Sequence, residues 1–303
     1  MVCHVQQAAG VSERRACQVL GQARSSRRYQ AKRPEDEPRL VARMLELVRE
    51  RPRFGYRRIW ALLVAEGWRV NRKRIHRLWR REGLKVPKKQ RKRRSLGCGA
   101  NACHRRKAEY KDHVWTWDFI FDRTVNGSSL KWLSIIDEYT RECLALKVDR
   151  SITAEDIIDT LAELFAMRGV PRHVRSRPTL RVGARGPEFI AHAIRDWLGR
   201  TGVETLYVEP GSPWENGYAE SFHSRLRDEL LNREIFDNLR TARAFAKAWK
   251  EDYNQVRPHS SLRYQTPAAF GAACAAAVFA ALSPQQHTPI PESNPNPTTP
   301  VLS

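Results

Sequence analysis

Val114-Trp-Thr-Trp-Asp-Phe-Ile-Phe121 is the stretch from which the expected architecture follows. Its residues alternate and are mostly aromatic or β-branched, which is typical of a strand. The Asn126-Gly127 pair that follows is a strong signal for a hairpin turn. Two further strands are expected at 130–136 and 142–148. The segment therefore predicts a three-stranded antiparallel meander.

The sequence after this meander predicts a mixed sheet. The expected elements are a helix at 153–168, a strand at 173–175, a helix at 188–199 and a fifth strand at 205–208. The order β-β-β-α-β-α-β-α is that of a ribonuclease H-like core. This α/β fold has a five-stranded sheet with the first strand in its centre and the fourth beside it. A helix at 239–253 and an irregular capping segment ending at residue 270 are expected to follow.

Asp118 stands in the middle of the first expected strand, between Trp117 and Phe119. A carboxylate among large apolar side chains is costly unless it is paired or binds a metal ion. An ion pair with an arginine is the purely structural alternative.

A second acid lies in the stretch Gly211-Ser-Pro-Trp-Glu-Asn-Gly-Tyr-Ala-Glu-Ser-Phe-His-Ser-Arg-Leu-Arg-Asp-Glu229. The stretch opens with turn residues and becomes helical, which places Glu220 in the first turns of a helix. Glu220, Ser224 and Arg227 follow the i, i+4, i+7 spacing of one helix face. Such a face suits a site that holds a metal ion and a phosphate together, although a solvated polar face would have the same pattern.

The positive charge of the chain is confined to its first third. Residues 1–113 contain 32 Lys and Arg against 10 Asp and Glu, whereas residues 114–303 contain 22 against 23. A basic block joined to a near-neutral domain indicates a nucleic-acid-binding module attached to another domain.

The remaining composition indicates a cytoplasmic protein. The six cysteines show no disulfide framework, and nothing resembles a secretory signal. The small-apolar run 271–282 is too short to span a bilayer. Cys98, Cys103 and His104 lack the fourth ligand and the spacing of a zinc site.

The basic third predicts a DNA-binding region. A short helical segment is expected at 1–36, followed by apolar helical patterns at 37–84. Two of these helices are joined by the turn 66–69, which indicates a helix-turn-helix. The last helix and the basic linker 85–112 supply the candidate DNA-binding residues, namely Arg72, Lys73, Arg74, Arg77, Arg80, Lys88, Lys89, Arg91, Lys92, Arg93 and Arg94. An ordinary three-helix bundle with a charged exterior is the alternative.

Five runs of the sequence resemble a known family. The runs Trp115-Thr-Trp-Asp-Phe-Ile, Ile136-Asp-Glu-Tyr-Thr-Arg-Glu-Cys, Gly186-Pro-Glu-Phe-Ile, Gly217-Tyr-Ala-Glu-Ser-Phe and Tyr253-Asn-Gln-Val-Arg-Pro-His-Ser-Ser-Leu resemble the second-frame transposases of the insertion-sequence-three family, relatives of retroviral integrases. The resemblance covers about residues 37–270.

The resemblance implies a DDE transposase that cleaves and joins DNA with Mg²⁺, or Mn²⁺ as a substitute. In such a site two metal ions stabilise the attacking and leaving oxygens. The first acid of the family falls on Asp118 and its Glu on Glu220, inside an integrase-like core at 113–270. The implied partners are the terminal inverted repeats of the element, target DNA, further copies of the chain and the first-frame product. A nucleoid-associated protein with a disordered tail at 271–303 is expected, and no membrane is involved.

The second acid of the family is missing here. The family reads Ser-Asp-Asn-Gly-Pro-Glu-Phe, with 35 residues between that Asp and the Glu. There are 35 residues between Ala184 and Glu220, so the spacing is kept but the carboxylate is lost. Seven residues that the family pattern lacks, 177–183, precede Ala184. Asp137 is expected near Asp118 without reaching the vacated position, and Glu188 is a weak substitute.

Two functions therefore remain open from the sequence. The chain is either a transposase whose chemistry is impaired, or an inactive protein that binds element ends and inhibits transposition. A nuclease of the same fold has less support, because the helix-turn-helix and the basic linker suit the recognition of DNA ends.

Overall fold

A computed structural model describes residues 1–29, 34–86, 106–176, 187–207 and 216–282. The chain divides into two compact units, Met1–Pro52 and Arg53–Ser303. This division falls inside the region 37–84 that the sequence assigns to DNA binding. The domain boundaries expected from the sequence remain predictions.

The first unit is helical in its described part, with α1 (Val2–Ala9), α2 (Glu13–Val19), α3 (Arg24–Arg28) and α4 (Glu37–Glu50). Three short helices, α1 to α3, thus stand where the sequence predicts a short helical segment. Ser12 caps α2 by accepting a hydrogen bond from the backbone N–H of Arg15. Leu40, Met44 and Leu47 of α4 are buried, so the apolar stripe expected there is confirmed.

The second unit begins with two helices joined by a tight turn. They are α5 (Tyr56–Ala65) and α6 (Arg72–Arg81). Gly67 lies in the turn with φ +93°, a backbone conformation that residues other than glycine rarely adopt. Trp60 Nε1 donates to the carbonyl of Val70 (2.9 Å), and Asn71 caps α6 by accepting from the N–H of Lys73 (2.8 Å). The expected pair of helices with a short turn is confirmed.

The centre of the second unit is a mixed five-stranded sheet in the order β3-β2-β1-β4-β5. Antiparallel pairs join β1 to β2 and β2 to β3, whereas β4 runs parallel to both β1 and β5. The first strand is central and the fourth lies beside it, as the sequence predicts. The strands are β1 (Val114–Arg123), β2 (Ser129–Asp137), β3 (Cys143–Asp149), β4 (His173–Ser176) and β5 (Glu204–Tyr207).

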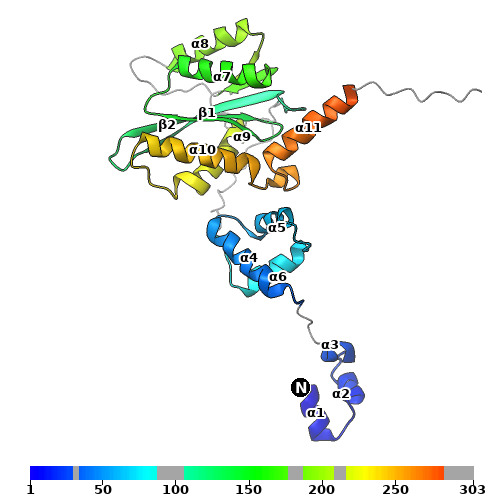
Figure 1. Ribbon diagram of the computed structural model, residues 1–303. Helices are drawn as coiled ribbons and strands as arrows, with labels where there is room; N and C mark the ends of the chain where they lie inside the picture. Colours follow the sequence, from blue (N-terminus) through cyan, green and yellow to red (C-terminus); the bar gives the residue numbers. More distant parts are fainter. Residues whose placement is uncertain (30–33, 87–105, 177–186, 208–215, 283–303) are drawn as a thin grey trace, which may run out of the picture. The chain divides into compact units, whose positions relative to one another are not determined.

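Helices cover both faces of this sheet (Figure 1). On one face lie α7 (Ala154–Arg168) and α8 (Pro187–Arg200), which enclose a core that includes Trp115 and Trp117. On the other face lie α9 (Gly217–Leu226) and α10 (Leu239–Gln255), which enclose a core that includes Ile120 and Trp132. Successive residues of β1 point to opposite faces of the sheet, so Trp115 and Trp117 both face α7 and α8. Even-numbered residues, Asp118 included, face α9 and α10.

The end of α9 continues into a π-helical segment, Arg227–Leu231. Such segments are rare and occur frequently at functional sites. A short 3₁₀-helix, Ser260–Leu262, follows α10.

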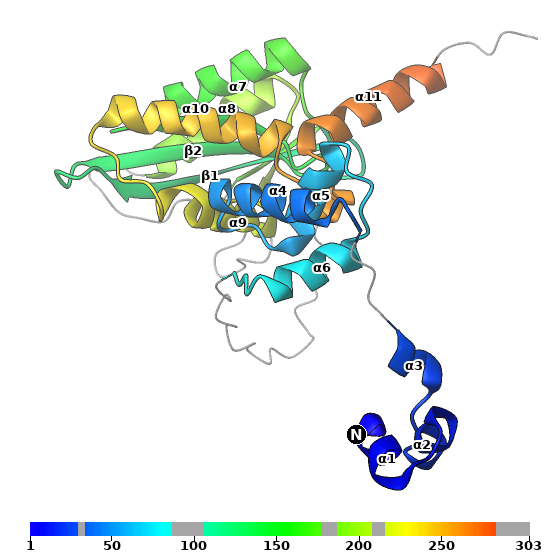
Figure 2. The same cartoon turned by 60° about the horizontal axis from the view of Figure 1, so that its bottom comes forward.

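The sequence prediction for residues 266–282 is wrong. An irregular segment and the start of a disordered tail were expected there, whereas Pro267–Leu282 forms the helix α11. Pro267 is favourable at the first position of a helix, and the Ala-rich run has high helix propensity. In Figures 1 and 2, α11 runs away from the sheet.

None of the helices in the described ranges has the length and apolarity needed to cross a membrane. Residues 283–303 lie outside the described residues.

A buried ion pair joins β4 to the turn after β2. Arg175 Nε donates to Glu138 Oε1 (2.8 Å), and the two side chains are only 4% and 0% exposed. Arg175 Nη2 also donates to the backbone carbonyl of Arg106 (2.8 Å). The pair is completely desolvated, so removing one partner would leave the other charge buried and unpaired.

We expect Glu138→Ala to lower the free energy of unfolding by about 3–5 kcal/mol, because the Arg175 guanidinium would lose its counter-charge. Urea unfolding followed by tryptophan fluorescence measures the change. The control is Lys147→Ala, which removes an ion pair to Asp156 whose side chains are both 35% exposed and leaves Asp156 to cap α7. An exposed pair is worth at most about 1 kcal/mol. Equal losses in the two variants would contradict the prediction.

Candidate active site and DNA-binding surface

Asp118 lies in a polar environment, unlike its neighbours in the sequence. Because residues alternate along β1, Trp117 and Phe119 point away from the face that Asp118 occupies. Its carboxylate is 12% exposed. Oδ1 accepts a hydrogen bond from the backbone N–H of Phe119 (2.8 Å), and Oδ2 accepts from Nδ2 of Asn216 (3.1 Å). The carboxylate therefore has its own hydrogen-bonding partners within the protein.

Asn216 and His223 connect α9 to β1. Asn216 Oδ1 accepts a hydrogen bond from the hydroxyl of Thr116 (2.9 Å), so its amide bridges two residues of the strand. His223 Nδ1 lies 3.9 Å from Asp118 Oδ2, and a hydrogen bond of 2.9 Å joins its Nε2 to the hydroxyl of Ser134. The side chains on both sides of Asp118 are thus fixed by hydrogen bonds.

These contacts place the helix that carries Glu220 beside the acid of the first strand. Asn216 and His223 are seven residues apart, or two helical turns, and both reach the Asp118 carboxylate. The helix between them therefore crosses the strand at Asp118. Ala219, which is completely buried, lies on the side of α9 that faces the strand, and Glu220 follows it at the exposed edge. The sequence prediction that Glu220 lies in the first turn of a helix is confirmed, and the loop expected before this helix lies outside the described residues.

The segment expected to carry the second acid lies outside the described residues. Ala184 and all of 177–186 belong to it, and the side chain of Glu188 in α8 is also outside the description. The described strand β4 ends at Ser176, whose Cα is paired with that of Trp117. The chain therefore enters this segment beside the residue that precedes Asp118.

Asp137 is not close to Asp118, contrary to expectation. The two acids are on antiparallel strands, but Asp118 is paired with Ser134 and Asp137 with Trp115. This offset of three residues is roughly 10 Å along the strand and puts the two side chains on opposite faces. Asp137 is completely buried and stabilises the turn after β2 by accepting from the hydroxyl of Thr140 (2.6 Å). Burial raises its pKa.

The donor atoms of the site suit a hard cation but are too few. Carboxylate oxygens such as those of Asp118 and Glu220 are the ligands that Mg²⁺ prefers. Within the described ranges, no group of three or more His, Cys, Asp or Glu side chains is placed to hold a metal ion. The described residues therefore fit the chemistry of Mg²⁺, but among them the ligands of a two-ion site are too few.

The sequence predicts Asp118 and Glu220 as site residues, but it did not point to Asn216 and His223, which contact Asp118 in the structure. Asn216 directly precedes α9, where asparagine is commonly the N-cap. Its side chain makes no capping hydrogen bond and is directed instead to the strand. The spacing of two turns between Asn216 and His223 was the available signal, although it does not show what the two side chains face.

The candidate DNA-binding residues of α6 lie on its outer side. Ile75, Leu78 and Trp79 are buried, which directs the intervening positions outward. Arg72, Lys73, Arg77 and Arg80 are exposed and Arg74 is half-buried. The candidates of the linker, Lys88, Lys89, Arg91, Lys92, Arg93 and Arg94, lie outside the described residues.

We expect Asn216→Ala to lower the free energy of unfolding by about 1–3 kcal/mol, because it leaves the buried hydroxyl of Thr116 without its acceptor. The double variant Asn216→Ala/Thr116→Val should be more stable than Asn216→Ala alone, since the unsatisfied hydroxyl is then removed. Urea unfolding of the two single variants and the double variant completes the cycle. Strictly additive losses would show that the two side chains do not interact.

Comparison with known proteins agrees with this architecture. The integrase core domain family matches residues 108–213 and 201–267, and the HTH-like domain family matches residues 35–94. The uncharacterised 31.7 kDa protein of insertion element IS407 from Burkholderia multivorans is 38% identical over 268 residues, covering 88% of this chain and 93% of that protein.

Two further relatives come from other insertion elements. The uncharacterised 39.2 kDa protein of IS476 from Xanthomonas euvesicatoria is 37% identical and covers 86% of this chain and 73% of that protein. The transposase InsD of IS2 from Escherichia coli is 28% identical and covers 78% of this chain and 79% of that protein. The chain belongs to the insertion-sequence-three family of insertion-element transposases, which have an integrase core domain.

Proposed function

We propose that this chain binds the ends of its insertion element and that its DNA cleavage and strand transfer are impaired. The observation that carries the proposal is the alanine at position 184, which is separated from Glu220 by the 35 residues of the family spacing. The rest of the acidic site is kept, because Asp118 is held on β1 beside the helix that carries Glu220. The scaffold of the reaction is therefore present without one of its acids.

DNA binding in this proposal rests on α6 and the basic linker. The exposed cations of α6 contact backbone phosphates, and side chains near the start of the helix contact base edges in the major groove. The terminal inverted repeats of the element are the specific DNA, and target DNA is bound through its backbone. The chain acts as a multimer together with the first-frame product.

A bound metal ion would supply charge stabilisation to the attacking and leaving oxygens of a phosphodiester. Asp118 and Glu220 would hold it through carboxylate oxygens. The missing position is not compensated by its neighbours in the sequence, because Arg177, Arg181 and Ala184 offer no anionic oxygen. Mg²⁺ or Mn²⁺ is therefore bound weakly.

A second function, inhibition of transposition, is favoured by the same substitution. A chain that occupies element ends, or that joins a multimer of intact transposases, blocks the reaction without catalysing it. The two functions differ in whether any strand transfer remains.

For the strand-transfer reaction, we expect the unaltered chain to be slower by roughly a thousandfold or more than a variant with Ala184→Asp and residues 177–183 deleted, since losing several kcal/mol of transition-state stabilisation has that effect. The assay uses duplexes copied from the two ends of the element with Mg²⁺ or Mn²⁺. Adding Asp118→Asn to the restored variant should abolish its activity. Rapid turnover by the unaltered chain would refute the impairment.

For metal binding, we expect calorimetric titration with Mn²⁺ to show no tight two-ion site in the unaltered chain. Its binding heat should resemble that of the Asp118→Asn variant, because too few carboxylates converge. The restored variant should bind more tightly than both. Tight binding of two ions by the unaltered chain would mean that another residue replaces the lost acid.

A further inference from the structure

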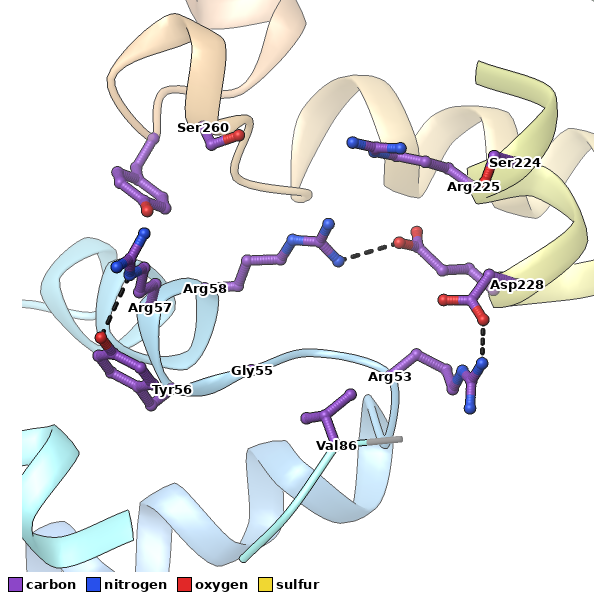
Figure 3. Close-up of a pocket in the computed structure, with 12 residues that line it drawn as sticks. Arg53, Gly55, Tyr56, Arg57, Arg58, Val86, Ser224, Arg225, Asp228 and Ser260 are labelled. Carbon is purple, nitrogen blue, oxygen red and sulfur yellow. Dashed lines mark hydrogen bonds and ion pairs between the residues drawn. The ribbon is translucent and has the colours of Figure 1, made fainter. Parts of the chain in front are cut away.

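A cavity of about 450 Å³ lies between the start of α5 and the junction of α9 with the π-helical segment. Figure 3 shows arginines from both sides directed into it. The residues that line it and that matter here are Arg53, Arg57, Arg58, Ser224, Arg225 and Asp228. All of them belong to the second unit.

The carboxylates at this cavity are already paired. Arg257, which is 1% exposed, donates from Nε and Nη2 to the two oxygens of Glu229 (both 2.7 Å). Arg58 Nη1 also donates to Glu229 (3.0 Å), and Arg53 pairs with Asp228. Three arginines therefore share two carboxylates. Figure 3 shows the pairs made by Arg53 and Arg58 at the edges of the cavity.

Arg57 and Arg225 add positive charge without a carboxylate of their own. Arg57 Nε donates to the hydroxyl of Tyr56 (3.2 Å), and Arg225 Nη1 donates to the backbone carbonyl of Ser221 (3.2 Å). Within the described ranges, neither guanidinium makes an ion pair with an acid. The cavity thus has five arginines against two carboxylates, including Arg257 behind Glu229.

The electrostatic effect of this excess is visible in neighbouring groups. Burial and the charge of Arg257 lower the pKa of Arg58 to about 10, and they also lower the pKa of Arg225. Burial, followed by four arginines, lowers the pKa of His259 to about 3. Burial is the first cause of each of these shifts and the nearby arginines add to it, so bound negative charge would favour the charged forms of Arg58 and Arg225.

The helix α9 connects the cavity to Glu220. Ser224 lines the cavity and lies one turn after Glu220 on α9. Four residues of helix rise by roughly 6 Å, which is about the distance covered by two nucleotides of a DNA strand at 3.4 Å each. A strand that passes Glu220 can therefore place a nearby phosphate in the cavity.

We propose that this cavity binds a backbone phosphate of the DNA strand that reaches Asp118 and Glu220, with Arg57, Ser224 and Arg225 as its ligands. The inference rests on the proposed function, because it assigns a second contact to the same DNA. Guanidinium groups suit phosphate, since their N–H donors match its oxygens. Contacts of this kind position the strand and carry no sequence information. Arg57 and Arg225 are therefore positioning residues.

The test measures how the affinity of the full chain for a short duplex of random sequence depends on salt. The variants are Arg57→Gln, Arg225→Gln and the double variant. Each single variant should bind several-fold more weakly and reduce the slope of log affinity against log salt by about one, because one phosphate contact is lost. The double variant should reduce the slope by about one as well, since both arginines hold the same phosphate.

Three controls make the result specific. Arg200→Gln changes an exposed arginine at the end of α8, on the opposite face of the sheet, and should leave the slope unchanged. Lys73→Gln on α6 should reduce it through a separate contact. Arg57→Lys/Arg225→Lys should restore the slope, because the charge returns. Melting temperatures equal to that of the unaltered chain show that the variants are folded.

The outcomes separate the two proposals. An unaltered slope in Arg57→Gln and Arg225→Gln, with a reduced slope in Lys73→Gln, overturns the phosphate site but leaves DNA binding intact. A double variant that reduces the slope by about two overturns the single shared phosphate. No DNA binding by the unaltered chain would overturn the proposed function and this inference together.

Discussion

The contact between α9 and β1 at Asp118 determines the geometry of the whole candidate site. Asn216 and His223 reach the same carboxylate from positions two helical turns apart. Between them Ala219 is completely buried, and its small side chain lets the helix approach the strand closely. The direction of every other residue on α9 follows, so Glu220 lies at the edge of the contact and Ser224 continues toward the arginine cavity.

This contact also explains how the fold is kept without the second acid. The Asp118 carboxylate is satisfied by an amide and a backbone N–H of the protein itself. A buried acid with such partners does not need a metal ion to balance its desolvation. Replacement of the acid expected at position 184 is therefore compatible with a stable core, because stability and metal binding depend on different partners of Asp118.

The arginine cavity shows why net charge is a poor guide to local charge. Residues 114–303 are nearly neutral overall, yet Arg225 and Arg257 from this part of the chain gather at one site with arginines of 53–58. Salt bridges to Asp228 and Glu229 neutralise part of the cluster and fix its geometry. What remains is a positive site beside an acidic one, which suits a polyanion whose phosphodiester must approach carboxylates.

The sequence by itself determined the order of strands and helices and the central place of β1, because periodicity and turn residues are local properties of the chain. The acids at 118 and 220 stay a prediction of the sequence. The sequence prediction was wrong about residues 267–282. A capping segment and a tail were expected there, but the high helix propensity of the Ala-rich run produces the helix α11. Only the tertiary structure decided that Asp137 lies on the opposite face, that Asn216 and His223 contact Asp118, and that Arg58 meets Glu229. These contacts join residues up to 171 positions apart, and strand register and helix packing, which no local pattern specifies, bring them together.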